Sequence, residues 1–526
     1  MDDTAPNVSQ SEPSKHVFVP ILASLLILAV LVFQGYQAWI AFDRDDTNHL
    51  ETPLLLATAR QLLDGPSTLY GPFSGTHPLV LIHAPLYYRV VGLAAWPLAR
   101  MGMEPVVATM IAGRLLSMLG LLGACIAAWK IARIDGETRA AGLFASCLIA
   151  SSPVFGSFGV TIRPDTLALA FQTAAFGLVL KCLRDGTSAS WWSVIGSAFF
   201  FGLAACVKQH LIVAAGVSAL LLIGATIRGQ LATRKVIAAF LVGIFVIVAY
   251  YSAEEFVTKG MMSKSVFLLP AHLRETVPAS WDHVQLVFWE VAKRGVGELV
   301  LGFAIVLVAG RGLFRGTWID GVLVVVFVAE TAAMVPLCLA SEGAFVNYAM
   351  PSVVWASILF GRALSRIASE PKHGWKRGFL VFAGLVLVAR GVQLAEKAQT
   401  ARQDDRGPLR TLLTDPAVAA IPPSQRYFVH LPQHNRMFGA VDLAHDEWLI
   451  QSYEKEGMID PRSHWLKDRL SGPSANVNVV VVPVSETEDG AYVPGIPASL
   501  PALGYRLVQQ FGRYAVWIRE PLDRAN

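Results

Sequence analysis

Residues 17–51 read VFVPILASLLILAVLVFQGYQAWIAFDRDDTNHLE, a long apolar run that passes directly into a crowded acidic stretch. The run from Val17 to Ile40 is long enough to cross a hydrocarbon core of about 30 Å, which needs roughly 20 apolar residues. Lys15 precedes the run, and no small-residue cleavage site follows it. The stretch therefore predicts an uncleaved membrane anchor that leads into an acidic loop.

The composition of the whole chain is that of a polytopic membrane protein. Of its 526 residues, 54% are hydrophobic and only 16% are charged, which is too apolar for a soluble protein of this length. The net charge of +4 is small and concentrated in loops, so it gives no indication of nucleic-acid binding. We expect membrane lipids, and no nucleic acid, among the partners.

Apolar runs predict ten further membrane-spanning helices, which makes about eleven with the first. These runs cover residues 106–130, 140–158, 164–182, 191–207, 209–227, 236–256, 297–311, 318–340, 344–364 and 378–395. The segment from Ala84 to Ala99 is ambiguous, because its apolar run is short and contains Pro85, Arg89 and Pro97. It either spans the membrane or lies in the interface.

Basic residues decide between these two topologies, because short cytoplasmic loops collect lysine and arginine. If Ala84–Ala99 does not span, the basic loops all lie on the same side as Lys15, and if it spans they all move outside. We therefore expect an interfacial or re-entrant helix at Ala84–Ala99, a cytoplasmic N-terminus, and an extracytoplasmic acidic loop and C-terminus. The basic loops on the cytoplasmic side contain Lys130, Arg133, Arg139, Lys181, Arg184, Arg228, Arg234, Lys235, Arg311, Arg315, Arg362, Arg366, Lys372, Lys376 and Arg377.

The composition becomes polar after about residue 395, which predicts two domains. Residues 1–395 form the membrane domain, with an outer loop over 42–105 that carries interfacial helices. Residues 396–526 form a small extracytoplasmic α/β domain, since RYFVH, NVNVVVVPV and YAVWIRE are short β-branched runs typical of strands, with helical stretches near 442–455 and 463–470. No internal repeat is present in the chain, unlike transporters built from duplicated halves.

Carboxylates at the outer helix ends are the candidate catalytic groups. Asp45 and Asp46 lie in the acidic loop, where a solvated helix exit is the alternative explanation. Glu51 begins the apolar run ETPLLLATARQLL, and Pro53 fits a first helical turn, where a negative charge is favoured. Asp165 follows Arg163 and Pro164 at a helix start, so it is either a functional acid or a helix cap.

Basic side chains near the same face could hold a phosphate. Arg114 lies about two turns below the outer end of its helix, where an arginine needs an anionic partner such as a lipid phosphate. Lys208 is either a phosphate ligand or a snorkelling lysine. His49, His77 and His83 share the first loop, but their spacing matches no metal motif, so no metal site is predicted. A divalent cation is compatible with the sequence but not required by it.

The order of several short motifs resembles that of a known family. An acidic residue, Glu51, precedes the pair Ala59–Arg60; Gly65, Tyr70 and HAPLYY (83–88) follow, and then AGRLLS (112–117). Later come R-x-D-x-L at 163–167, Lys208–Gln209, and G-x-x-x-N-Y at 343–348. This order resembles the GT-C superfamily of membrane glycosyltransferases, in the branch of the protein O-mannosyltransferases and lipid A aminoarabinose transferases (family 39-like).

The resemblance covers the membrane half of the chain and implies an inverting sugar transfer from a polyprenyl-phosphate donor to a lipid, glycan or protein acceptor. It implies a general base among Glu51, Asp45 and Asp46, supported by Asp165, with Arg114, Arg163 and Lys208 near the donor phosphate. It implies substrate contacts from Tyr87, Tyr88, Gln209, Asn347 and Tyr348. The expected setting is a bacterial inner membrane and a role in cell-envelope glycan synthesis.

The sequence departs from the family pattern at two positions. Thr52 follows Glu51 where the family has an adjacent Asp-Glu pair, and Ala84 replaces the first proline of its PPLYY segment. The first departure leaves open which acid of the loop is the base. Two other function classes stay open as alternatives: a lipid or solute transporter, and a glycan ligase or polymerase that would use His272, Arg274 and His283 in an outer loop.

Overall fold

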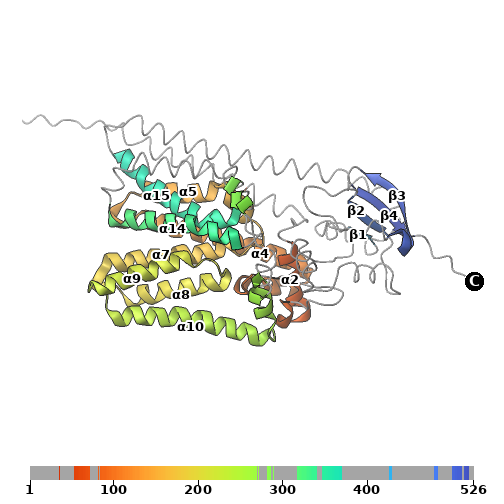
Figure 1. The fold of residues 1–526 in the computed structure, drawn as a ribbon, viewed down its shortest axis with the longest axis horizontal. Helices are drawn as coiled ribbons and strands as arrows, with labels where there is room; N and C mark the ends of the chain where they lie inside the picture. The colour runs from red at the N-terminus through yellow and green to blue at the C-terminus, as the bar shows by residue number, and fades with distance from the viewer. Residues whose placement is uncertain are drawn as a thin grey trace, which may run out of the picture.

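The structure is a computed structural model of the chain. It describes residues 35, 52–70, 81, 83–268, 270–271, 281–282, 284–285, 288–289, 317–340, 346–369, 426–428, 479–483, 500–511 and 514–519. Figure 1 shows long helices packed side by side, with a small sheet formed by residues near the C-terminus.

The helices of the described residues follow the hydrophobic runs of the sequence. They are α2 (Thr52–Asp64), α3 (Leu86–Arg100), α4 (Pro105–Ala132), α5 (Arg139–Ser151), α6 (Pro153–Phe158), α7 (Asp165–Asp185), α8 (Trp191–Val207), α9 (Val213–Ile227), α10 (Thr233–Val257), α11 (Met261–Ser263), α14 (Trp318–Ala340) and α15 (Met350–Ser369). Short helical turns are η2 (Pro66–Thr68), η3 (Ile134–Gly136), η4 (Gly186–Ser188), η5 (Lys264–Leu268), η6 (Val346–Ala349) and η8 (Pro501–Leu503).

Helices lie at eight of the predicted spans, with some corrected boundaries. The predicted span 140–158 is two helices, α5 and α6, because Pro153 disfavours helical backbone at Ser152, whose ψ is 128°. The run 209–227 becomes helical only at Val213, and the run 344–364 becomes α-helical at Met350 after the turn η6. The predicted spans 297–311 and 378–395, and all of 17–40 except residue 35, lie outside the described residues.

Four helices in the described part of the chain are long and apolar enough to cross a membrane, which fits an integral membrane protein. They cover Pro105–Ala132, Asp165–Ser188, Thr233–Val257 and Trp318–Leu337. The helices α5, α8 and α9 are shorter but also apolar. Helix α10 exposes Leu241, Ile244 and Phe245, which is the surface expected of a helix that faces lipid.

Helix α3 occupies the ambiguous segment Ala84–Ala99. It is 15 residues long, contains Pro97, and is not among the helices long enough to span. It packs against α2, α4 and α8. Its placement at a membrane interface stays a prediction.

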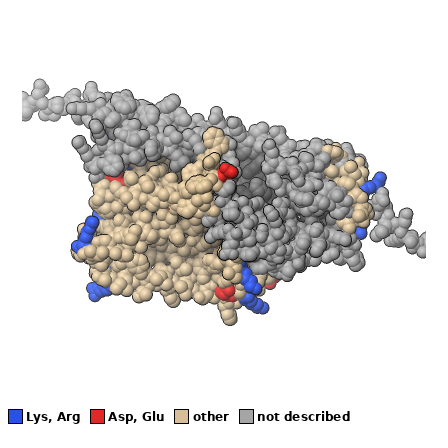
Figure 2. Space-filling view, viewed as in Figure 1, with Lys and Arg blue, Asp and Glu red and all other residues tan. Residues whose placement is uncertain are grey.

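Those basic loops that the structure describes lie at one end of the bundle. Because consecutive helices run in opposite directions, the end of α7 at Arg184, the end of α9 at Arg228 and the start of α10 at Arg234 come together there. Figure 2 shows lysine and arginine at that end and a long uncharged surface beside it. The positive-inside argument requires these loops to share one end, and their cytoplasmic side stays a prediction.

The same end is joined internally by a network of two arginines and two acids. Arg362 of α15 is fully buried, and its Nε donates to Asp320 Oδ1 of α14 at 2.7 Å. Arg366 bonds to Asp320 Oδ2 at 2.7 Å and to Glu137 Oε1 at 2.6 Å. The charges balance, so the network stabilises the packing of α14 and α15 against the start of α5.

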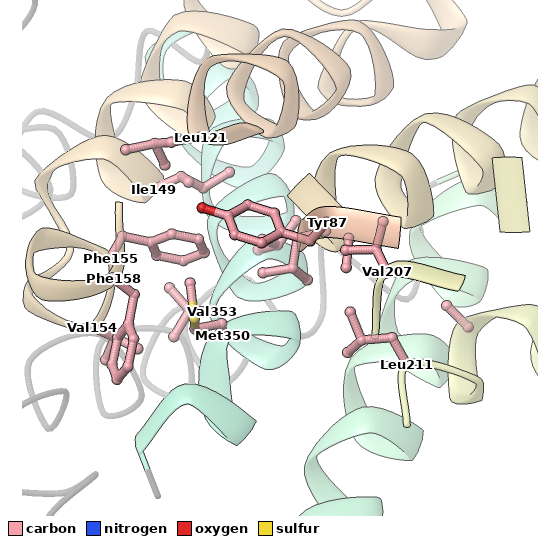
Figure 3. Close-up of a cluster of buried hydrophobic side chains, with 14 of the residues drawn as sticks. Tyr87, Leu121, Ile149, Val154, Phe155, Phe158, Val207, Leu211, Met350 and Val353 are labelled. Atoms are coloured by element: carbon pink, nitrogen blue, oxygen red, sulfur yellow. The ribbon is translucent and has the colours of Figure 1, made fainter. Parts of the chain in front are cut away.

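The core of the bundle depends on close helix contacts, part of which is drawn in Figure 3. Helices α4 and α7 approach each other at Gly120, where an added Cβ would lie 2.5 Å from the backbone nitrogen of Leu167. Only glycine allows this approach, which is how small residues promote helix association in membranes.

A four-stranded sheet forms near the C-terminus from β1 (Arg426–Phe428), β2 (Val479–Pro483), β3 (Tyr505–Phe511) and β4 (Tyr514–Arg519). The order is β1-β2-β4-β3, with β1 parallel to β2 and the other pairs antiparallel. The three predicted strands are present, and β3 is one that the sequence reasoning missed, because Arg506 and Gln509 interrupt its apolar pattern. The predicted helices near 442–455 and 463–470 lie outside the described residues.

Gly120→Ala is expected to destabilise the protein, because the new Cβ meets backbone rather than a movable side chain. Overpacking of this kind costs about 1–3 kcal/mol, which thermal unfolding in detergent measures as a lower midpoint. Gly224→Ala in α9 is the matched control, since nothing lies within 4 Å of its added Cβ. An unfolding midpoint for Gly120→Ala equal to that of Gly224→Ala would contradict the packing argument.

Candidate functional site

The buried carboxylate of Asp165 is the centre of the polar cluster opposite the basic end. Asp165 is the first residue of α7 and only 1% exposed. Lys208 Nζ donates to Asp165 Oδ1, and Asn347 Nδ2 donates to the same oxygen at 2.9 Å. Arg163 Nε donates to Oδ2 at 3.2 Å. Both oxygens therefore have partners, and these come from three separate parts of the chain.

The local sequence explains why Asp165 lies at this position. Pro164 takes the cap position, so Asp165 begins α7, where the helix dipole favours a negative charge. Ser117 of α4 holds the turn before it: Ser117 Oγ donates to the carbonyl of Arg163 at 3.1 Å and lies 3.4 Å from its amide nitrogen. Thr166 Oγ1 donates to the carbonyl of Ser117 at 2.7 Å. Helix α4 thus fixes the orientation of the R-P-D turn.

Tyr87 connects α3 to the same part of α4. Its side chain is fully buried, and its hydroxyl donates to the carbonyl of Gly113 at 2.8 Å and lies 2.7 Å from Ser117 Oγ. Figure 3 shows Tyr87 among the core side chains, so its hydroxyl is held within the protein. Arg114 follows Gly113 on α4 and is 3% exposed, which places the third predicted phosphate ligand in this region of the helix.

The connection between α8 and α9 supplies three consecutive polar side chains to the cluster. Lys208, which directly follows α8, bonds to Asp165 and lies 5.5 Å from the ring centre of Tyr348. Gln209 Oε1 accepts from the amide of Ala84 at 3.2 Å. The ring of His210 stacks on Tyr348 at 4.7 Å. The three side chains therefore link the connection to Asp165 of α7, to Ala84 and to Tyr348 of η6.

His83 and Tyr88 complete the described cluster. The Tyr70 hydroxyl donates to the carbonyl of His83 at 2.7 Å, and the rings of His83 and Tyr88 stack at 6.4 Å. Burial, together with the positive charges of Arg163 and Lys208, lowers the pKa of His83 from 6.5 to about 3. The imidazole is therefore neutral at physiological pH. The buried hydroxyl of Tyr88 has no hydrogen-bond partner among the residues that the structure describes.

A buried ion pair, not predicted from the sequence, joins three helices beside this cluster. Arg89 of α3 contacts Glu254 of α10, with Nη2 2.7 Å from Oε2. Arg89 Nη1 also donates to Gln61 Oε1 of α2 at 3.1 Å and to the carbonyl of Pro66 at 2.6 Å. The sequence shows an arginine inside the apolar segment 84–99 and an acid at the end of a predicted span. It does not show that these two residues, 165 positions apart, form an ion pair.

The structure thus brings together six residues of the predicted site, namely Asp165, Arg163, Lys208, Gln209, Asn347 and Tyr348. Tyr87 belongs to α3 and is hydrogen-bonded to α4. Glu51, Asp45 and Asp46 lie outside the described residues. The described part of α2 begins at Thr52. Within the described ranges no group of three or more His, Cys, Asp or Glu side chains could hold a metal ion.

Residues 93–251 match the model of the dolichyl-phosphate-mannose-protein mannosyltransferase family. No curated protein sequence matches the chain. Its fold is similar to that of ArnT from Cupriavidus metallidurans, solved bound to undecaprenyl phosphate, with a TM-score of 0.56, 12% identity, and coverage of 96% of this chain and 98% of ArnT. The apo structure of ArnT matches with a TM-score of 0.58 and 13% identity over 95% of this chain and 97% of ArnT.

A second solved protein shares the fold over most of this chain. It is the oligosaccharyltransferase AglB from Archaeoglobus fulgidus, in complex with an inhibitory peptide and a dolichol-phosphate, with a TM-score of 0.51 and 12% identity. The alignment covers 97% of this chain and 75% of AglB. The family match and the shared fold confirm the resemblance stated from the motifs: the chain has the fold of the GT-C superfamily of polyprenyl-phosphate-dependent membrane glycosyltransferases.

Proposed function

We propose that the protein is a membrane glycosyltransferase that moves a sugar from a polyprenyl-phosphate donor to a lipid, glycan or protein acceptor, with inversion. The observation that carries the proposal is the buried cluster of Asp165, Lys208, Arg163 and Asn347. It lies at the end of the bundle opposite the basic loops, in a fold that ArnT uses to bind undecaprenyl phosphate.

The charges of the cluster favour an anionic ligand. Arg163 and Lys208 both contact the single carboxylate of Asp165, and His83 is neutral, so these groups together keep one positive charge in excess. Arg114, which is 3% exposed on α4, is the third predicted phosphate ligand. A donor phosphate would satisfy this excess, and cations in a low-dielectric site stabilise the negative charge that develops on a departing phosphate.

Asp165 is best suited to orient the cations, because both of its oxygens already accept hydrogen bonds. The general base is then an acid of the preceding loop. We assign this role to Glu51, which precedes Thr52 in the sequence, with Asp45 and Asp46 as the alternatives. The base removes the proton of the acceptor hydroxyl as its oxygen attacks the sugar and the C–O bond to the phosphate breaks.

The sugar and the acceptor would contact the polar side chains around the cluster. Tyr88 offers a buried hydroxyl that has no partner among the described residues. Asn347, Tyr348 and Gln209 lie beside Lys208 and Asp165, and Tyr87 supports them through α4. Residues 1–395 would form this catalytic membrane domain and residues 396–526 an extracytoplasmic domain, in a bacterial inner membrane with a cytoplasmic N-terminus.

Asp165→Asn is expected to lower sugar transfer about 100-fold or more, because it removes the charge that holds Lys208 and Arg163 in place. The assay is transfer of radiolabelled sugar from a panel of polyprenyl-phosphate donors to membrane extracts by the purified protein. Asp185→Asn, at the basic end, is the control and should retain wild-type transfer.

Loss of the buried pair also affects folding, since an uncompensated buried charge costs about 3–5 kcal/mol. The double variant Asp165→Asn with Lys208→Met removes both charges and separates the two effects. It is expected to recover the unfolding midpoint but not the transfer. Full transfer by the double variant, or no transfer by wild type with any donor, would refute the proposed function.

His83→Asn is expected to reduce the dependence of stability on pH. Because the folded-state pKa of His83 is below 6.5, the unfolded chain binds one more proton as the pH falls from 6.5 towards 3. The contribution of neutral His83 to the free energy of unfolding is fully present above pH 6.5. Below pH 6.5 it falls by about 1.4 kcal/mol per pH unit. Unfolding midpoints at pH 7.5 and 5.5 measure it, and an equal drop in wild type and variant would show that His83 is not kept neutral.

A further inference from the structure

Helix α14 carries a second buried acid, Glu330, near its middle. The residue is 6% exposed. Glu330 Oε1 accepts from Gln172 Nε2 of α7 at 2.7 Å and from the amide of Ala214 at the start of α9 at 3.2 Å. Among the described residues, no lysine or arginine forms an ion pair with it. An acid inside a membrane bundle is costly, which makes function the default explanation.

The hydrogen bond from the Ala214 amide to Glu330 caps helix α9, which has no side-chain cap from the residue before it. The residue before α9 is Ile212, whose side chain cannot accept a hydrogen bond, and no side-chain cap is present. The first amides of a helix have no partner within it, and an unpaired buried amide is costly. Glu330 supplies the missing acceptor from another helix, and its negative side chain suits the positive end of the helix dipole.

This helix start determines where the connection before it lies. Residues 208–212 run from the end of α8 to the start of α9 and carry Lys208, Gln209 and His210. Ala214 is six residues beyond Lys208, so the connection is short and is held at its far end by Glu330. Gln172 lies seven residues after Asp165, about 10 Å further along α7, so the same carboxylate also contacts the helix that begins with Asp165.

We propose that Glu330 is a positioning residue for the donor site, because it caps α9 and so holds Lys208, Gln209 and His210 against Asp165, Ala84 and Tyr348. The inference rests on the proposed function for its effect on the donor. Its structural part, the anchoring of residues 208–216, stands independently. The role needs an acceptor oxygen rather than a negative charge, since the partners Gln172, Ala214 and Trp355 are all neutral donors.

Two substitutions of Glu330 distinguish a requirement for an acceptor oxygen from a requirement for a negative charge. Glu330→Gln keeps an acceptor oxygen at the same reach, and Glu330→Met has a similar length but no oxygen acceptor. For Glu330→Met we expect the KM for the polyprenyl-phosphate donor to rise about tenfold, the factor that corresponds to one lost hydrogen bond. We expect Glu330→Gln to stay within about threefold of wild type, because it keeps that acceptor.

Hydrogen exchange measured by mass spectrometry supplies a readout that needs no turnover. We expect faster exchange of the amides of residues 208–216 in Glu330→Met, and wild-type exchange there in Glu330→Gln. Asp320→Asn is the matched control: it alters a second buried acid of α14, ten residues away, within the network at the basic end. It should lower the unfolding midpoint without changing the donor KM or the exchange of residues 208–216.

Glu330→Asp is the second variant if Glu330→Met is not recovered folded, because its shorter carboxylate withdraws from Ala214 with little change in volume. It should show the same two changes to a smaller degree. Wild-type exchange and wild-type KM in folded Glu330→Met or Glu330→Asp would overturn the inference. So would a folded Glu330→Gln as impaired as Glu330→Met, because the charge would then be required. If wild type transfers no sugar, the proposed function fails, while the exchange of residues 208–216 still decides the anchoring role.

Discussion

The buried contact between Asp165 and Lys208 is the interaction on which the candidate site depends. Asp165 comes from the start of α7 and Lys208 from the end of α8, and neither charge is stable in an apolar interior alone. Their pairing fixes the α8–α9 connection against α7, and Asn347 adds the turn before α15. A charge pair that is expensive to bury thus determines how three separate segments meet.

Polar groups at three levels of the bundle have three different arrangements. At the basic end, Asp320 and Arg362 belong to an ionic network with Glu137 and Arg366, in which two acids balance two arginines. In the interior, Glu330 accepts from neutral donors. At the opposite end, Arg163 and Lys208 outnumber the one carboxylate they share. Of these three groups of described residues, only the third has a positive excess, which favours an anion.

Hydrophobic length was sufficient to predict most of the helices, because a helix in lipid needs a long apolar run whatever its neighbours are. It was insufficient at Ser152–Pro153, where one predicted span is two helices. The strand β3 was not predicted, because its polar residues interrupt the alternation of apolar and polar side chains that is typical of a strand. In the site, Arg163, Asp165, Lys208 and Asn347 were predicted as a set and do lie together, although their roles are still proposals.

By itself, the sequence determined the apolar character of the chain, the sites of its helices and the kinds of ionisable group at their ends, since these depend on residues close together in the chain. Only the tertiary structure decided the partners. Arg89 meets Glu254, Glu330 caps α9, and Ser117 holds the turn before Asp165. These pairs join residues 46 to 165 positions apart, and their formation depends on helix packing, which no local pattern of residues encodes.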